Sequence, residues 1–155
     1  MLALAVPTAS HAQKRLVKSP KILSAKTVYF DNRTGDEAVG SATVAELRKW
    51  GRFQVVLNKQ MADLILLLSA DPYKGGYIIF ASGQTGTIDK DGHIEEDLVP
   101  NYNRLAPVRD AYLTVIDPRS GEDLWSDSHV WGGLLTGKNS AGARLVQKLQ
   151  KQIAR

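Results

Sequence analysis

Cysteine is missing from the 155-residue sequence, and so is any long apolar run. Without cysteine the chain has no disulfide, no thiolate metal ligand, no cysteine nucleophile and no lipid-bearing cysteine. Without a run of about 18 apolar residues, the sequence predicts no transmembrane segment. The three histidines, His11, His93 and His129, have no ligand-type residue at the spacing of a recognised motif. We therefore expect neither a metal site nor a cofactor.

The overall composition is that of a soluble globular protein, with 43% apolar and 23% charged residues. A chain of this length is expected to form one domain that buries about 70% of its unfolded surface. The net charge is +4, and it is unevenly distributed. Residues 13–26 and 138–155 carry basic side chains without an acidic one, whereas residues 89–97 are mainly acidic. We interpret these blocks as solvated faces or tails.

Residues 1–12 resemble the second half of a secretory signal peptide. A short apolar run is followed by Ser10 and Ala12, the small residues of a cleavage site before Gln13. The basic segment that normally opens a signal is lacking, and a flexible apolar tail is the alternative interpretation. We favour export, which makes the protein periplasmic or secreted. The predicted organisation is then a signal-peptide remnant at 1–12, a basic linker at 13–25 and a single α+β domain at 26–155.

Residues 109–133 carry the clearest local pattern, which predicts an antiparallel hairpin. The β-branched and aromatic residues 111–116 predict one strand, and residues 124–131 predict the second. Between them, Pro118 and Gly121 supply turn chemistry. Because side chains alternate along a strand, one face of the second strand carries four candidate partner-binding residues: Trp125, Asp127, His129 and Trp131.

Two interpretations of this aromatic face are open. Tryptophan is usually well buried, which favours packing beneath a helix or rim. Tryptophan is also enriched at interfaces, which favours partner binding. If two helices cover the opposite face of the sheet, the aromatic face is left partly open. In that arrangement we expect Trp131 to contact a partner or a second copy, and Trp125 to be more buried.

Two amphipathic helices are predicted. Asp36 begins the first, and Gly51 ends it. The second covers residues 140–154, where apolar side chains recur on one stripe: Ala141, Leu145, Leu149 and Ile153. Lys148 and Lys151 lie on the other side of that helix, where we expect them to be exposed.

Strand patterns outnumber the helices. They cover residues 27–30, 53–57 and 76–81, with a looser hairpin at 84–96. Residues 64–68 form an apolar run without alternation, which is typical of a central strand covered on both faces. The predicted fold class is α+β, a mainly antiparallel or mixed sheet of five to seven strands with two helices packed on one face.

Several short motifs together resemble one family of bacterial envelope domains. In order they are Thr27-Val-Tyr-Phe-Asp-Asn-Arg-Thr-Gly35, a helix, Phe53-Gln-Val-Val, Ala62-Asp63-Leu-Ile-Leu-Leu and Asp117-x-x-x-Gly121-x-x-Leu-Trp125. The family comprises α+β domains similar to the TolB amino-terminal domain and to the penicillin-binding-protein activator and curli-secretion lipoproteins. The resemblance implies a non-catalytic periplasmic domain that works through protein contacts. This chain lacks the lipid-bearing cysteine of the lipoproteins and the propeller of TolB, so outer-membrane anchoring and a TolB role are not implied.

Catalytic motifs are incomplete in this sequence. Asp127 and His129 share a strand face, but Ser126 and Ser128 point to the other one. No Gly-x-Ser-x-Gly elbow and no phosphate-binding glycine loop occurs. Residues 89–94 resemble the middle of a calcium loop without its first and last acidic ligands, and we interpret them as a hairpin tip. The sequence therefore predicts that the protein is not an enzyme.

The leading functional hypothesis is an exported, non-catalytic interaction domain that binds another envelope protein or envelope component, or a second copy of itself. One alternative is nucleic-acid binding through the basic last helix. No aromatic residue interleaves that helix and export would separate it from nucleic acid, so none is expected as a partner. Another alternative is a small ligand carrier or hydrolase that uses the face between Trp125 and Trp131.

Export makes the first testable prediction. When the full gene is expressed, cleavage after Ala12 should leave Gln13 as the first residue of the mature protein. Amino-terminal sequencing and intact mass measure this directly. An uncleaved product that stays in the cytoplasm would contradict the predicted location.

Overall fold

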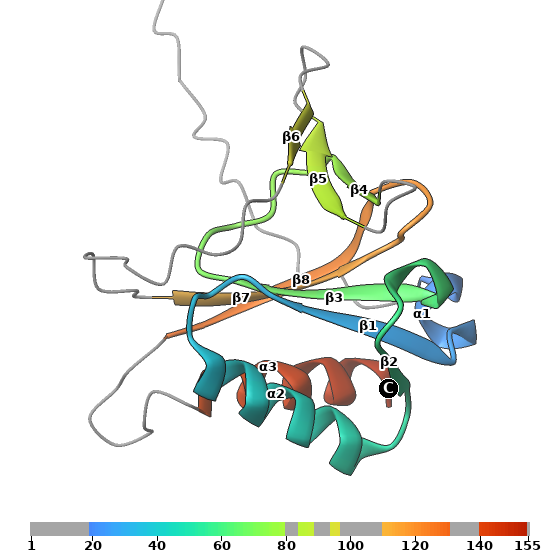
Figure 1. Ribbon diagram of the computed structural model, residues 1–155. Helices are drawn as coiled ribbons and strands as arrows, with labels where there is room; N and C mark the ends of the chain where they lie inside the picture. The colour runs from blue at the N-terminus through green and yellow to red at the C-terminus, as the bar shows by residue number, and fades with distance from the viewer. Residues whose placement is uncertain (1–18, 80–83, 89–93, 97–109, 131–139, 155) are drawn as a thin grey trace, which may run out of the picture.

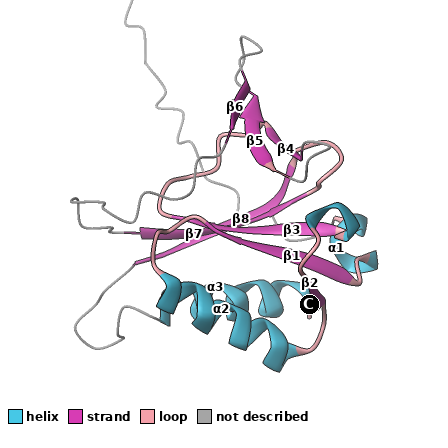
Figure 2. Cartoon of the chain, in the orientation of Figure 1, coloured by secondary structure: helices cyan, strands magenta, loops and turns pink. Residues whose placement is uncertain are grey.

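A five-stranded mixed sheet with two long helices beneath it forms the framework of the protein (Figures 1 and 2). The computed structural model describes residues 19–79, 84–88, 94–96, 110–130 and 140–154. The strand order of the main sheet is β2-β1-β3-β7-β8. Its strands are β1 (Thr27–Asn32), β2 (Gln54–Val56), β3 (Leu64–Ser69), β7 (Asp110–Ile116) and β8 (Asp123–Val130).

The pairing within this sheet is mixed. Strand β1 is parallel to both β2 and β3, whereas β7 is antiparallel to β3 and β8 is antiparallel to β7. Helices α2 (Glu37–Trp50) and α3 (Ser140–Ile153) lie side by side on one face of the sheet (Figure 1). The predicted α+β class, with a mixed sheet and two helices on one face, is confirmed.

Strand β3 runs through the centre of the sheet and is buried on both faces. Leu64, Leu66 and Leu68 belong to the hydrophobic core on the helix side. Ile65 and Leu67 belong to a second apolar cluster on the opposite side. The absence of alternation in the sequence therefore had the predicted cause, a strand without a solvent-facing side.

Helix α2 begins and ends as its sequence predicts. The Asp36 carboxylate accepts hydrogen bonds from the backbone N–H groups of Ala38 and Val39, at 2.9 and 3.2 Å. These bonds satisfy donors that have no partner inside the helix. Gly51 ends the helix in the left-handed region, with φ of 69°.

Helix α3 packs against both the sheet and helix α2. The predicted apolar stripe is buried at Ala141, Leu145 and Leu149. At Gly142, a Cβ atom would lie 1.8 Å from the Thr43 hydroxyl oxygen of α2. The glycine thus lets the two helices approach more closely than a side chain would allow.

A second, three-stranded sheet lies over the face of the main sheet that the helices leave uncovered (Figure 1). It is antiparallel and consists of β4 (Tyr77–Ile79), β5 (Thr85–Ile88) and β6 (Ile94–Glu96). Its β5–β6 pair confirms the predicted second hairpin. The predicted turn of that hairpin, at Asp91 and Gly92, lies outside the described residues.

Part of the predicted linker at 13–25 is folded, which corrects that boundary. Residues Pro20–Ser24 form the short helix α1, with Ser19 as N-cap and Pro20 at its first turn. Ile22 has no exposed surface and joins the helix-side core. Little in the sequence indicates this helix, because it is only five residues long and buries a single side chain, that of Ile22.

Helix α3 provides a stability prediction. Leu149 is fully buried, so Leu149→Ala should lower the free energy of unfolding by about 2–5 kcal/mol. The matched control is Lys151→Ala on the exposed side of the same helix, which should change it by less than about 0.5 kcal/mol. Urea unfolding measures both. Equal effects of the two variants would mean that α3 does not pack as described.

Candidate interaction surface

The predicted aromatic face lies beneath the helices. Trp125 is paired with Val115 in the hairpin register, is 6% exposed and belongs to the helix-side core. This confirms that Trp125 is buried. The arrangement in which the helices cover the opposite face is not found, because the α3 stripe packs on the face that carries Leu113, Val115 and Trp125. Trp131 lies outside the described residues, so its contact with a partner stays a prediction.

Asp127 and His129 continue this face toward the end of β8, where both side chains are half-buried and Lys148 of helix α3 contacts the strand. Lys148 donates to the Asp127 carboxylate at 3.3 Å and to the Ser128 carbonyl at 2.6 Å. Lys148 therefore holds α3 against β8 and does not extend into solvent as expected. Burial, Lys148 and Arg144 together lower the pKa of His129. The face is a half-buried helix–strand contact.

A partly buried ionic cluster joins the main sheet to the second sheet. The Tyr77 hydroxyl and the Arg33 guanidinium both donate to one oxygen of Asp31, each at 2.9 Å. Arg33 also reaches the Thr85 hydroxyl at 3.2 Å and lies over the Tyr77 ring. Burial and the Asp31 charge raise the pKa of Tyr77. The hydroxyl therefore stays protonated throughout the physiological pH range and remains a hydrogen-bond donor to Asp31. Asp31, Arg33 and Tyr77 all contact one another, which indicates that the cluster has a structural role and holds the second sheet against the main sheet.

A second polar cluster holds helix α1 against the rest of the domain. Lys21 forms an ion pair with Asp117 in the turn between β7 and β8. Asp63 accepts hydrogen bonds from the backbone N–H groups of Lys26 and Thr27, at 2.8 and 2.9 Å, and these bonds lower its pKa. The hollow between these segments has a volume of about 450 Å³. Its carboxylates already have partners within the chain.

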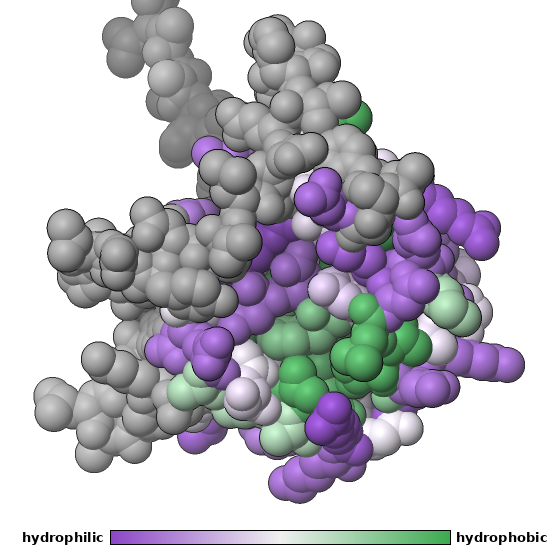
Figure 3. Space-filling view, in the orientation of Figure 1, coloured by the Kyte–Doolittle hydropathy of each residue, from purple (hydrophilic) through white to green (hydrophobic). Residues whose placement is uncertain are grey.

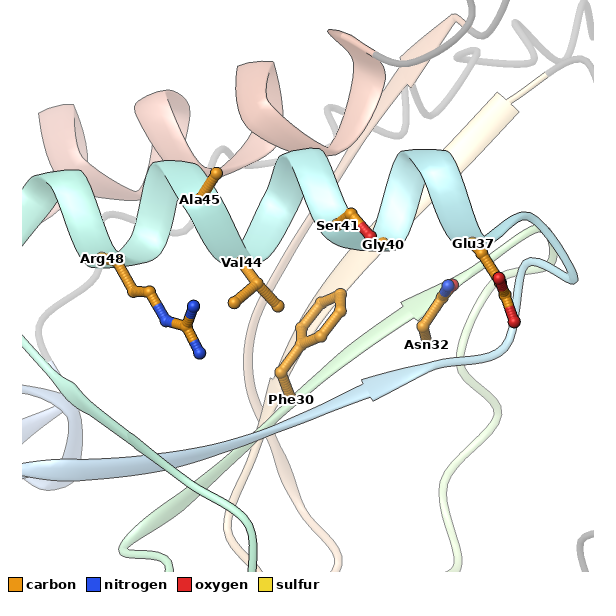
Figure 4. A pocket seen from close by; sticks show the side chains of 8 residues that line it. All are labelled: Phe30, Asn32, Glu37, Gly40, Ser41, Val44, Ala45 and Arg48. Carbon is orange, nitrogen blue, oxygen red and sulfur yellow. The ribbon is translucent and has the colours of Figure 1, made fainter.

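An open groove of about 420 Å³ lies between helix α2 and strand β1 (Figure 4). Phe30 and Val44 face one another across it, while Glu37 and Arg48 stand at its two ends (Figure 4). Asn32, Gly40, Ser41 and Ala45 complete the lining. Figure 3 shows apolar side chains gathered into one patch over this part of the molecule.

The strand edge above the groove has no partner in the part of the chain that the structure describes. Strand β2 pairs with residues 27–29 of β1, whereas β3 pairs with residues 28–32 on the other side. Residues 30–32 therefore have a free edge where β2 has ended. Leu57, the residue after β2, is 94% exposed, and Met61 in the 3-10 helix η1 (Lys59–Met61) is 72% exposed. Residues 30–32, Leu57 and the α2–β1 groove are called the β1 edge surface below.

Sequence reasoning did not find the β1 edge surface. It predicted a strand at 53–57, which would have paired Leu57 beside Phe30 and shortened the free edge. The available signal was Asn58, whose side chain caps η1 by accepting from the Gln60 N–H. An N-cap residue directly after Leu57 requires the chain to leave the sheet there.

Neither a metal centre nor a membrane span is found in the described part of the chain. No group of three or more His, Cys, Asp or Glu side chains is placed to hold a metal ion among these residues. No helix among them is long and apolar enough to cross a membrane. The calcium-like stretch is described only at Ile94, and the rest of it lies outside the described residues.

Comparisons with known proteins identify distant structural neighbours. No protein-family model matches the sequence. No curated protein matches it either. A dodecameric PelC variant from Paraburkholderia phytofirmans aligns with a TM-score of 0.39 and 15% identity, over 83% of this chain and 85% of that one. Lipoprotein GNA1162 from Neisseria meningitidis aligns with a TM-score of 0.36 and 15% identity, over 83% of this chain and 98% of that one.

The Asp31 cluster provides a prediction that tests whether its hydrogen bonds stabilise the contact between the two sheets. Tyr77→Phe removes one hydrogen bond to a partly buried carboxylate, so it should lower the free energy of unfolding by about 1.5–3 kcal/mol. Tyr112→Phe is the control, because the Tyr112 hydroxyl has no hydrogen bond to another described residue, and it should stay within about 0.5 kcal/mol. Urea unfolding of both variants tests this. An unchanged stability in Tyr77→Phe would show that the cluster does not fasten the two sheets.

Proposed function

We propose that the protein is an exported, non-catalytic domain that acts by binding a protein partner of the bacterial envelope at the β1 edge surface. The observation that carries the proposal is the free edge of residues 30–32 directly above an apolar groove. An unpaired strand edge offers backbone donors and acceptors to another chain. The groove offers pockets for alternate side chains, which is the usual way such an edge becomes specific.

Export rests on the Ser10-x-Ala12 ending of the apolar lead, and the envelope context rests on the motif resemblance between residues 27 and 125. The groove of the β1 edge surface fits this assignment because its lining combines apolar area with one charged side chain at each end, Glu37 and Arg48. Nucleic-acid binding has less support. Lys148, a cation of the proposed basic helix, is directed at the Ser128 carbonyl and Asp127 instead of outward.

Paired surface variants test the proposal. Leu57→Glu places a charge in the β1 edge surface at an almost fully exposed position, so it should abolish capture of the partner without lowering the melting temperature. Val130→Glu makes the same change on the opposite edge of the sheet, at a residue that is 65% exposed, and should leave capture intact. The measurement is crosslinking in cells followed by affinity purification of each variant.

The two variants also separate the two candidate surfaces. Loss of capture in Val130→Glu alone would move the interface to the end of β8, beside the predicted contact residue Trp131. Full capture by both variants would contradict a protein-binding role for either edge of the main sheet.

A further inference from the structure

We infer that Lys148 and Asp127 keep the outer edge of strand β8 closed, and that this edge pairs with the same edge of a second copy of the chain once their contact is removed. The inference goes beyond the proposed function, because it concerns the opposite side of the main sheet. It is carried by the backbone N–H and carbonyl of Ser128, both of which are bonded to charged side chains.

Strand β8 is the last strand of the main sheet in the part of the chain that the structure describes. It is eight residues long, and β7 pairs with it on one side only. Three of its residues, Ser126, Ser128 and Val130, are exposed. A long exposed edge of this kind is a template for the addition of another strand, so proteins commonly block it.

The bonds of Ser128 show which backbone groups face this edge. Its N–H donates to the Asp127 carboxylate at 2.7 Å, and its carbonyl accepts from Lys148 at 2.6 Å. Both groups therefore point away from β7. Because bonded and non-bonded pairs alternate along an antiparallel ladder, the backbone groups of Ser126 and Val130 also face outward. The N–H and carbonyl groups of these three residues are called the β8 edge below.

Lys148 and Asp127 block the centre of the β8 edge. Lys148 reaches the edge from helix α3 and also donates to the Asp127 carboxylate at 3.3 Å. The two side chains satisfy both backbone groups of Ser128 and place an ammonium group where an added strand would lie. A lysine at an edge strand is one of the means by which proteins prevent edge-to-edge association.

The side chains beside Ser128 favour a second copy as the occupant of the opened edge. With a two-fold axis through Ser128, an antiparallel pair of β8 strands places Asp127 of each copy opposite His129 of the other. The imidazole N–H can then donate to the carboxylate on both sides of the axis. An axis through Asp127 would instead bring two carboxylates directly opposite one another, which is unfavourable.

The same axis satisfies the backbone of the β8 edge. Ser128 of one copy exchanges two hydrogen bonds with Ser128 of the other, in place of the bonds to Asp127 and Lys148. Ser126 of each copy pairs with Val130 of the other in the same way. Beyond β8 the described residues contain no further strand of the main sheet that would obstruct this pairing.

Removal of the lysine from the full-length chain tests the inference. Lys148→Ala frees the Ser128 carbonyl and takes the ammonium group off the edge. It should self-associate at least about tenfold more tightly than the wild type in sedimentation equilibrium, which is about the free energy of one or two backbone hydrogen bonds. Lys151→Ala, at an exposed position of the same helix, is the matched control and should associate as the wild type does.

A second substitution of the same lysine separates edge opening from loss of folding. Lys148→Met keeps the aliphatic stem and removes only the charged donor, so it should show the same gain in association. Thermal unfolding by circular dichroism verifies that each variant is folded, and Lys148→Met replaces Lys148→Ala if that variant is not.

A proline on the edge distinguishes strand pairing from general association. The Ser126 N–H faces outward, so Ser126→Pro keeps the pairing with β7 while its ring blocks an added strand. Combined with Lys148→Ala, it should return the association to the wild-type level.

The absence of cysteine allows the register of the pairing to be measured. In the Lys148→Ala background, Ser128→Cys places two thiols at the two-fold axis, where the Cα atoms lie about 5.5 Å apart, within reach of a disulfide. Ser126→Cys is the control on the same side of the strand, because its two copies would lie about 14 Å apart along the strands. Mild oxidation should link the chains through position 128 and leave the control unlinked on a non-reducing gel.

Four results would overturn the inference. They are unchanged association in both Lys148 variants, a gain that Ser126→Pro does not reverse, equal linking at both cysteine positions, and linking of Ser128→Cys that is as strong with Lys148 in place. None of these measurements involves the β1 edge surface. The proposed function therefore stands or fails separately, on partner capture by Leu57→Glu.

Discussion

The structure depends on a central strand that has no solvent-facing side. Leu64 to Leu68 of β3 are buried on both faces of the sheet, so each face needs a covering layer. Helices α2 and α3 cover one face, and residues around Tyr77 cover the other. A single sheet with helices on one side would expose Ile65 and Leu67 to water. The second sheet is therefore required by the composition of β3, and the Asp31–Arg33–Tyr77 cluster fastens it there.

Much of this framework could be predicted from the sequence because the signals are local. The Asp36 cap, the Gly51 stop and the spacing of Leu145 and Leu149 define the two helices, and the unbroken apolar run defines β3. Which face the helices cover could not be predicted, since the alternation of β8 is compatible with either side. Long-range packing decides it: the α3 stripe meets Trp125, and Lys148 reaches the far end of the same strand.

The candidate interaction surface was harder to predict than the fold. In the sequence, Phe30 has the pattern of an ordinary strand residue. Glu37 and Arg48 occupy positions that are typical of the solvated side of a helix. Whether the edge beside Phe30 is free depends on where β2 ends, and one residue decides that. With a strand that continued to Leu57, the edge beside Phe30 would be closed. Because Asn58 caps η1, the chain turns away after Val56 and leaves residues 30–32 open.

The groove stays open because helix α2 cannot move to fill it. At its amino terminus, the Asn32 side chain donates to the Asp36 carbonyl at 2.9 Å, and a Cβ atom at Gly40 would lie 2.3 Å from the same amide nitrogen. At its middle, Thr43 meets Gly142 of α3 with no intervening side chain. The helix is thus fixed against both β1 and α3, and the Phe30 ring keeps its later turns away from the strand. A surface held in this way loses little conformational entropy when it is covered, so the limited area of one strand edge can still support specific pairing.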